Sequence, residues 1–232
     1  MTDADRHTPM MSAEEVERIR RWHENAYANA QAEAGSAGQT FSYLGLTLHV
    51  PPTVQPITGV SELLGEAVLA EARAGDRVLD MGTGSGVNAI LAATQGATVV
   101  AVDINPDALD AARRNAESNG VVIDVRHSDV FTAVDGEFDL IVFDPPFRWF
   151  APRDRLELAT TDHNYQAMTR FFAEARGHLT PGGRMLIFFG SSGDLAYLRH
   201  LMDGHGFQVE VVAERELVKD GQPVRYLTFR LT

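Results

Sequence analysis

Cysteine is absent from this chain of 232 residues, and Lys219 is its single lysine. The lack of cysteine excludes disulfides, a thiolate nucleophile, and zinc or iron–sulfur centres bound through cysteine. No apolar run approaches the roughly 18 residues that span a bilayer, and no signal-like stretch precedes the charged opening. We therefore expect a cytoplasmic protein without a membrane partner. The histidines include no pair at ligand spacing on a helix, so we expect no metal site.

Basic residues are also scarce, since 20 Lys and Arg stand against 32 Asp and Glu and give a net charge of −12. A protein that grips a phosphate backbone normally carries a basic patch or stripe. The sequence shows neither an element rich in Lys and Arg nor a recognisable nucleic-acid module. This balance disfavours a nucleic-acid partner but does not exclude one, because a local basic patch can hide within an acidic total.

The apolar pattern divides the chain into three parts: a tail and an amphipathic helix in 1–40, a β-hairpin extension in 41–59, and a core in 60–232. Residues 1–11 have no periodicity and are predicted to form a mobile tail. A capping box at 12–15 then starts a helix over 13–33, which the stretch 34–38 ends. Apolar alternation on either side of Gly45 predicts the hairpin.

The core alternates helices and strands. We expect helices over 60–73, 85–95, 106–119, 167–179 and 195–201, with Asn105 as the cap of the third. We expect strands over 77–81, 98–103, 121–126, 138–143, 185–189, 207–212 and 224–231. Residues 180–183 are predicted to turn into the fifth of these strands. Strands that alternate with helices pair in parallel, whereas Asp220-Gly221 favours an antiparallel final pair. The predicted class is α/β, with a Rossmann-like, mostly parallel seven-stranded sheet, an antiparallel C-terminal hairpin, and helices on both faces.

A glycine-rich loop follows the first parallel strand. Gly82, Gly84 and Gly86 alternate shortly after Asp80, and glycine there lets the backbone approach a ligand and leaves the next helix terminus open. Asp103 follows Gly82 by about the 20 residues expected of an acid that binds a ribose hydroxyl. We therefore expect a nucleoside-bearing cofactor. A tight turn without a ligand is the alternative.

The glycine spacing distinguishes between cofactors. A dinucleotide fingerprint needs glycine at the sixth position of G-x-G-x-x-G, where this chain has Val87. The observed G-x-G-x-G, with Asp80 before it, resembles the first motif of class I S-adenosylmethionine-dependent methyltransferases. The resemblance implies that Asp103 holds the ribose and that Asp129 contacts the adenine amino group, although Asp129 could instead cap a helix. The implied cofactor residues are Asp80, Gly82, Thr83, Gly84, Gly86, Asp103, Ile104, Asp129, Val130 and Asp144.

The strand 138–143 ends in Asp144-Pro145-Pro146-Phe147. Two prolines cannot continue a ladder, so the backbone must turn outward in a fixed shape. Such a corner can hold an acceptor and an apolar face towards a substrate; the alternative is that Asp144 satisfies loop amides and Phe147 is core. With the glycine loop, this corner makes roughly residues 41–232 similar to HemK/PrmC-like methyltransferases and to the amino-methyltransferases of nucleobases.

Two departures from the HemK-type enzymes concern the acceptor. The chain has one plausible helix ahead of its hairpin where the release-factor enzymes have a helical domain, and Asp144 stands where they have Asn. An ionised carboxylate accepts hydrogen bonds but cannot donate them, so Asp144 favours a target nitrogen that presents N–H groups. The catalytic residues implied are Asp144, Pro145 and Phe147. The implied substrate residues are Pro146, Phe147, Trp149, His163 and Tyr165, of which the last two could instead cap and pack the following helix.

The sequence therefore predicts an S-adenosylmethionine-dependent N-methyltransferase. Its acceptor would be an amine, guanidine or amide nitrogen of a small molecule or protein, with the helix over 13–33 as a candidate cover. Three alternatives stay open: an RNA or DNA base-amine methyltransferase, an NAD-dependent oxidoreductase, and a non-catalytic cofactor-binding subunit. The oligomeric state is not indicated.

Overall fold

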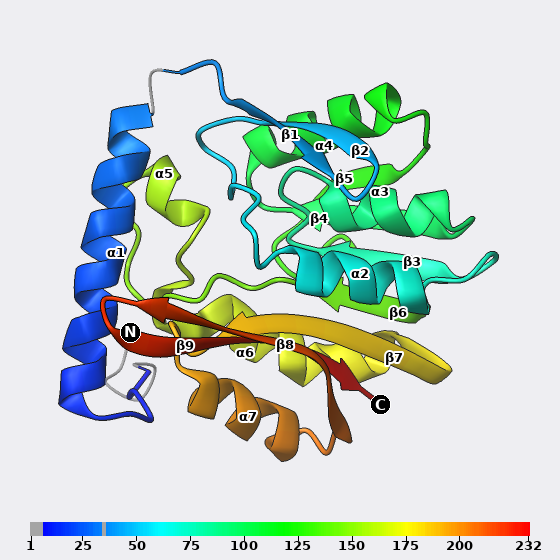
Figure 1. Cartoon of the computed structure of the whole chain (residues 1–232). Coiled ribbons are helices and arrows are strands. Elements are labelled where there is room, and N and C mark those ends of the chain that lie inside the picture. Colours follow the sequence, from blue (N-terminus) through cyan, green and yellow to red (C-terminus); the bar gives the residue numbers. More distant parts are fainter. Residues whose placement is uncertain (1–6, 34–35) are drawn as a thin grey trace.

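The computed structural model describes residues 7–33 and 36–232, and its centre is one twisted sheet (Figure 1). Its strands are β3 (Arg77–Met81), β4 (Thr98–Asp103), β5 (Asp124–His127), β6 (Phe138–Phe143), β7 (Leu179–Gly190), β8 (Val209–Lys219) and β9 (Gln222–Leu231). They lie in the order β5-β4-β3-β6-β7-β9-β8. Strands β3 to β7 pair in parallel, and β9 runs antiparallel to both β7 and β8. The predicted class and the antiparallel C-terminal hairpin are confirmed.

Helices cover both faces of the sheet (Figure 1). They are α1 (Ala13–Glu33), α2 (Glu62–Glu71), α3 (Val87–Thr94), α4 (Pro106–Ser118), α5 (Arg155–Leu158), α6 (Gln166–Ala175) and α7 (Leu195–Gly204). Successive strand residues point to opposite faces. Val78 therefore joins the apolar cluster beneath α2 and α3, whereas Leu79 joins the cluster beneath α1, α6 and α7. Within the described residues, no helix is long and apolar enough to cross a membrane.

Several local signals act as predicted. Ser12 and Glu15 form the capping box, since the Glu15 carboxylate accepts from Ser12 N at 2.9 Å and Ser12 Oγ accepts from Glu15 N at 3.2 Å. The Asn105 side chain caps α4 by accepting from the amide of Asp107. Asp220 and Gly221 both have positive φ, 51° and 73°, as a tight turn between antiparallel strands requires.

Several strand boundaries were wrong, and β8, for example, covers Val209–Lys219 rather than 207–212. Strand β5 begins at Asp124 rather than at 121, because 121–123 make no ladder with β4 and the side chain of Val122 is 91% exposed. Residues 180–183 lie within β7 rather than in a turn before it. They form a bulge there, since the register with β6 jumps from Phe138↔Leu179 to Leu140↔Arg184.

The segment before α1 also differs from the prediction. Residues 1–6 lie outside the described part of the chain, but His7 is not part of a mobile tail. Its side chain is 1% exposed, and its Nε2 lies 3.1 Å from a carboxylate oxygen of the fully buried Asp194. The Met10 amide donates to the same oxygen at 2.7 Å. These donors compensate the burial of a charged group, so 7–10 are docked where β7 ends. The predicted end of α1 at 34–38 falls partly outside the described residues.

The predicted hairpin is present as a separate two-stranded sheet. Strands β1 (Gln39–Tyr43) and β2 (Leu46–Val50) pair antiparallel around Leu44 and Gly45, which both have positive φ. The hairpin begins two residues earlier than expected. Leu46 and Leu48 share the apolar cluster of α2 and α3, so the hairpin lies on that face of the molecule.

Candidate active site

The candidate site lies at the carboxyl ends of β3, β4 and β6. The register places Met81 beside Val102 on one side and beside Phe143 on the other. Residues 82, 103 and 144 follow these three positions directly. The parallel sheet therefore brings the glycine loop, the second-strand acid and the proline corner to one edge, where open α/β sheets bind ligands.

The glycine loop has the backbone shape that the spacing predicted. Gly82, Gly84 and Gly86 all have positive φ, at 66°, 54° and 85°. Gly86 is required for a second reason, because a Cβ atom there would lie 2.9 Å from the Cα atom of Ala112 in α4. Helix α3 begins at Val87, two residues later than expected, because Gly86 in its left-handed conformation is the N-cap. The first amides of α3 therefore face the edge where a ligand would bind.

The Asp80 carboxylate holds this loop in place through hydrogen bonds. One carboxylate oxygen accepts from Thr83 Oγ1 at 2.6 Å and from the amide of Ala89 at 3.1 Å. Burial raises the pKa of Asp80 to about 7, against the lowering effect of these two bonds. The observed role of Asp80 and Thr83 is to hold the loop against the first turn of α3. Their direct contact with a cofactor stays a prediction.

Asp103 is held in place by two backbone amides. Its Oδ2 accepts from Gly84 at 2.9 Å and its Oδ1 from Asn105 at 2.8 Å. Burial raises the pKa of Asp103, and the bonds from Asn105 and Gly84 oppose this rise. A carboxylate has about four acceptor positions, so this one can still receive ribose hydroxyls. Ile104 beside it is 48% exposed and offers an apolar face to a flat ring.

Asp129 and Val130 follow β5, at the far side of the same edge. The Asp129 carboxylate forms an ion pair with Arg170, and both side chains are a little under half exposed. Val130 is buried and has a φ of 52°, a conformation that valine rarely adopts. The structure therefore places both residues near the sheet edge. Their contact with a cofactor stays a prediction.

Asp144 differs from the other acids of the site. Its side chain is half-buried, yet its carboxylate has no hydrogen-bond partner in 7–33 or 36–232, which contradicts the alternative that it satisfies loop amides. Burial raises the pKa of Asp144 to about 7, and the charge of Asp80 adds to the rise. An acceptor at this depth with free oxygens is available to a ligand.

The far end of the proline corner is firmly held. The Phe147 carbonyl accepts from the Tyr165 hydroxyl at 2.7 Å, and a Cβ atom on Gly193 would lie 2.3 Å from the same oxygen. The Phe147 ring is half-buried and packs against Phe189, with ring centroids 4.8 Å apart. Pro145 is buried beneath the corner. These contacts fix the backbone that carries Asp144.

The structure does not bring the remaining predicted substrate residues to one surface. Trp149 is buried, and Tyr165 is fully buried with its hydroxyl also accepting from the amide of Asp194. Pro146 is half-buried, whereas His163 is exposed and lies beside Asn164. Packing is the observed role of Tyr165. Substrate contact by Pro146, Trp149 and His163 stays a prediction.

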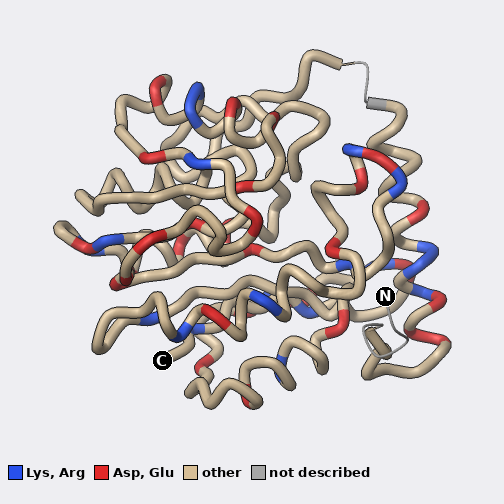
Figure 2. The backbone as a smooth tube through the Cα atoms, turned by 180° about the vertical axis from the view of Figure 1, so that it is seen from behind, with Lys and Arg blue, Asp and Glu red and all other residues tan. Residues whose placement is uncertain are grey.

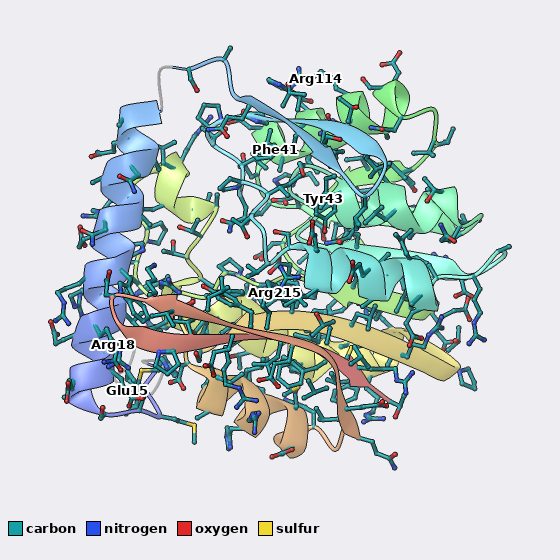
Figure 3. The ribbon with its side chains drawn as sticks, viewed as in Figure 1. Glu15, Arg18, Phe41, Tyr43, Arg114 and Arg215 are labelled. Carbon is teal, nitrogen blue, oxygen red and sulfur yellow. The ribbon has the colours of Figure 1, made fainter. Side chains whose placement is uncertain are left out.

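One residue near Asp144 was not found from the sequence. The hydroxyl of Tyr43, in the hairpin, donates to Ser61 O at 2.8 Å, and the side chain points towards α2 (Figure 3). Burial, then Glu62 and Asp144, raise the pKa of Tyr43 above its ordinary value. The hairpin is therefore fixed to the start of α2, a position that local apolar alternation does not specify.

Comparison with known proteins agrees with this geometry. A family model described as the methyltransferase small domain matches residues 57–218. The chain belongs to the methyltransferase small-domain family. The predicted resemblance to class I and HemK-like methyltransferases is confirmed.

Three relatives illustrate the range of the family. Ribosomal RNA small subunit methyltransferase C of Chromohalobacter salexigens is 36% identical over 178 residues, which cover 74% of this chain and 49% of that protein. A Methanocaldococcus jannaschii protein, provisionally named a protein N5-glutamine methyltransferase, is 35% identical over 147 residues, which cover 59% of this chain and 73% of the relative. The structure of a T. thermophilus 16S rRNA N2 methyltransferase with AdoMet and guanosine aligns with a TM-score of 0.56 and 26% identity, and covers 83% of this chain and 50% of that one.

The chain spans about half the length of the two relatives that act on ribosomal RNA by name. The prediction that disfavoured nucleic acid is not supported, because those relatives are nucleic-acid enzymes by name. Net charge does not decide the substrate class, because it averages over a surface of which a substrate contacts only a part.

Proposed function

We propose that this protein is an S-adenosylmethionine-dependent N-methyltransferase whose acceptor is a nitrogen that carries N–H groups. The observation that carries the proposal is Asp144, a half-buried carboxylate that lacks a hydrogen-bond partner within the described residues and lies beside the glycine loop. Family membership supports the reaction class, and the AdoMet in a relative's structure supports the methyl donor.

The residues at the sheet edge fit this donor. The left-handed glycine loop and the first amides of α3 would face its methionine part, Asp103 would accept from its ribose, and Ile104 would lie against its adenine. When bound, S-adenosylmethionine supplies a methyl group on a positively charged sulfur that leaves readily. The protein therefore has mainly to align the acceptor and exclude water.

The proline corner performs that alignment. Asp144 accepts one N–H of the acceptor and the Pro145 carbonyl accepts another, so that the nitrogen lone pair points along the line of displacement. As the methyl–sulfur bond breaks and the C–N bond forms, positive charge would develop on the nitrogen, and the Asp144 carboxylate would stabilise it. The methylated nitrogen would then lose a proton to this carboxylate or to water. Tyr165 and Gly193 hold the corner rigid, so little reorganisation accompanies the reaction.

Two acceptor classes are proposed. Nitrogen of a protein or small molecule is supported by the provisional glutamine-methyltransferase relative. An exocyclic base amine is favoured by the ribosomal RNA relative and by the guanosine in the solved structure. Lys and Arg are mixed with Asp and Glu over the view in Figure 2. RNA binding would therefore depend on local contacts at the corner rather than on the overall charge.

Two measurements on the purified chain test the proposal. Isothermal titration should show binding of S-adenosylmethionine but not of NAD. Mass spectrometry with labelled S-adenosylmethionine should then show a gain of one methyl group on one member of a panel of amines, guanidines, peptides and ribosomal RNA. Cofactor binding without transfer to any acceptor would instead support a non-catalytic cofactor-binding subunit, and absence of cofactor binding would overturn the proposal.

A further inference from the structure

Two asparagines, Asn115 in α4 and Asn119 at the C-cap of α4, bind the outer edge of the hairpin. Asn119 pairs with Thr47, since its Oδ1 accepts from the Thr47 amide at 3.1 Å and its Nδ2 donates to the Thr47 carbonyl at 2.9 Å. Asn115, one turn earlier, pairs with His49 in the same way at 2.8 and 2.9 Å. The two side chains thus satisfy the backbone groups of β2 that a further strand would otherwise satisfy.

Asn115 and Asn119 differ in where their third side-chain bond goes. Asn119 Nδ2 also donates to the Asn115 carbonyl within the same helix end at 2.7 Å, whereas Asn115 Nδ2 donates to the carbonyl of Ser85 at 2.8 Å. The Asn115 side chain is 3% exposed. Ser85 lies between the second and third glycines of the loop. Both N–H groups of the amide and its oxygen are therefore engaged. A single buried side chain joins the hairpin to the glycine loop.

Residues 51–54, which follow β2, lie against the glycine loop. The Thr53 carbonyl accepts from Asn105 Nδ2 at 2.8 Å, and the Thr53 hydroxyl donates to Asp107 at 2.8 Å. Val54 is buried, and its Cγ1 lies 3.7 Å from the position of a Cβ atom on Gly84. Residues 51–54 are thus fixed beside the middle glycine of the loop.

We propose that residues 51–54 and the hairpin form a wall of the methyl-donor site, and that Asn115 is the positioning residue that fixes this wall relative to the glycine loop. The inference rests on the proposed function, which assigns the loop to S-adenosylmethionine. Removal of the Asn115 amide would leave His49 N–H and C=O unpaired in a half-buried place and Ser85 C=O unpaired in a buried one. Such groups regain partners by moving, so the loop and the wall would lose their fixed separation.

The test compares two variants of the full chain by isothermal titration with S-adenosylmethionine. Asn115→Ala should raise the Kd about tenfold, the effect of losing about one buried hydrogen bond. Asn119→Ala is the matched control, because it removes the same pair of bonds to β2 but none to the loop. It should change the Kd by less than about twofold. Thermal midpoints of both variants separate the loss of folded protein from the loss of affinity.

A third variant keeps the test decisive if Asn115→Ala does not fold. Val54→Ala removes apolar atoms that face Gly84 and should raise the Kd about threefold or more. Equal Kd values for Asn115→Ala and Asn119→Ala, or an unchanged Kd for Val54→Ala, would overturn the inference. An unaltered chain that fails to bind S-adenosylmethionine would instead overturn the proposed function.

Discussion

Single residues of the site differ in how their carboxylate oxygens are used. Asp80 and Asp103 each accept two hydrogen bonds from the protein. Asp144 accepts none from residues 7–33 or 36–232, although it is half-buried. An unpaired charge in such a place is costly, and this cost is what raises its pKa. A ligand that donates hydrogen bonds to this carboxylate removes that cost on binding.

The raised pKa of Asp144, about 7, predicts how the rate depends on pH. Only the ionised carboxylate accepts without donating, so kcat/KM should rise with pH along a limb with an apparent pKa near 7. Asp144→Asn should remove this limb. A rate that is constant between about pH 5.5 and 8.5 in the unaltered chain would contradict the role assigned to Asp144.

The same shift has a consequence for stability. The pKa values of Asp80 and Asp144 in the folded chain lie above the unfolded value of about 3.9. The folded state therefore binds more protons between about pH 4 and 7, and the free energy of unfolding should decrease as pH rises through this window. Urea unfolding of Asp144→Asn should show a weaker decrease than that of the unaltered chain.

Tyr165 is expected to act through the corner it holds. Tyr165→Phe keeps the ring but leaves the Phe147 carbonyl and the Asp194 amide unpaired. We expect kcat to fall about tenfold while the Kd for S-adenosylmethionine is unchanged, because the cofactor loop is not touched. Tyr197→Phe is the control, since the Tyr197 hydroxyl bonds to Thr169 and its ring stacks on Tyr165. Equal losses of kcat in both variants would show a general packing effect.

At the scale of elements, α1 is joined to two segments that are far apart in sequence, α5 and the tip of the β8–β9 hairpin. His23 Nε2 lies 2.7 Å from the buried Glu157 carboxylate in α5, and Trp22 Nε1 donates to Asp220 at the tip of the β8–β9 hairpin at 2.6 Å. Figure 1 shows α1 alongside α5 and this tip. The helix is therefore fixed to the segment that follows the reactive corner. Its action as a cover over a substrate stays a prediction.

Glu157 provides a test of this attachment. Burial raises its pKa, but hydrogen bonds from Arg153 and His23 outweigh burial and lower the pKa of Glu157 to about 2. This value lies below that of the unfolded chain, so its contribution to stability should be complete above about pH 4.5 and lost as pH falls towards 2. Glu157→Gln should lower the free energy of unfolding by about 2 kcal/mol at pH 7 in urea.

The control for this variant is Glu24→Gln. Glu24 pairs with Arg153 at 2.9 Å, but both side chains are about half exposed. Exposed pairs contribute at most about 1 kcal/mol, so Glu24→Gln should be much milder than Glu157→Gln. Similar losses in the two variants would mean that the buried contact does not hold α1.

Local signals predicted the parts of the site whose shape depends on neighbours in sequence. The glycine loop, the Asn105 cap and the proline corner belong to this class. The φ preference of glycine, the missing N–H of proline and a side-chain cap all act within a few residues. Tyr43 and Asn115 could not be found in this way. Their roles depend on a hairpin that packs against α2 and α4 across long stretches of chain. The predicted start of β5 was wrong for a different reason, because residues 121–123 are apolar but do not pair with β4, and Val122 is exposed.

Over the whole molecule, the part of the chain that the family model matches and the part that precedes it contribute different features of the site. The family model begins at residue 57 and includes the glycine loop, the second-strand acid and the proline corner. Residues 7–33 and 36–56 lie before it and supply the docked His7 segment, α1, and the hairpin. These three elements lie around the edge that holds the reactive corner. We expect acceptor specificity to depend on them more than on the cofactor core.

The most direct test of the account is Asp144→Ala in the full chain. Methyl transfer from labelled S-adenosylmethionine should fall by at least about a hundredfold, since the carboxylate acts on charge that develops in the transition state. The Kd for S-adenosylmethionine, measured by isothermal titration, should stay within about twofold of the original because Asp103 and the glycine loop are intact. Unchanged transfer in this variant would contradict the account.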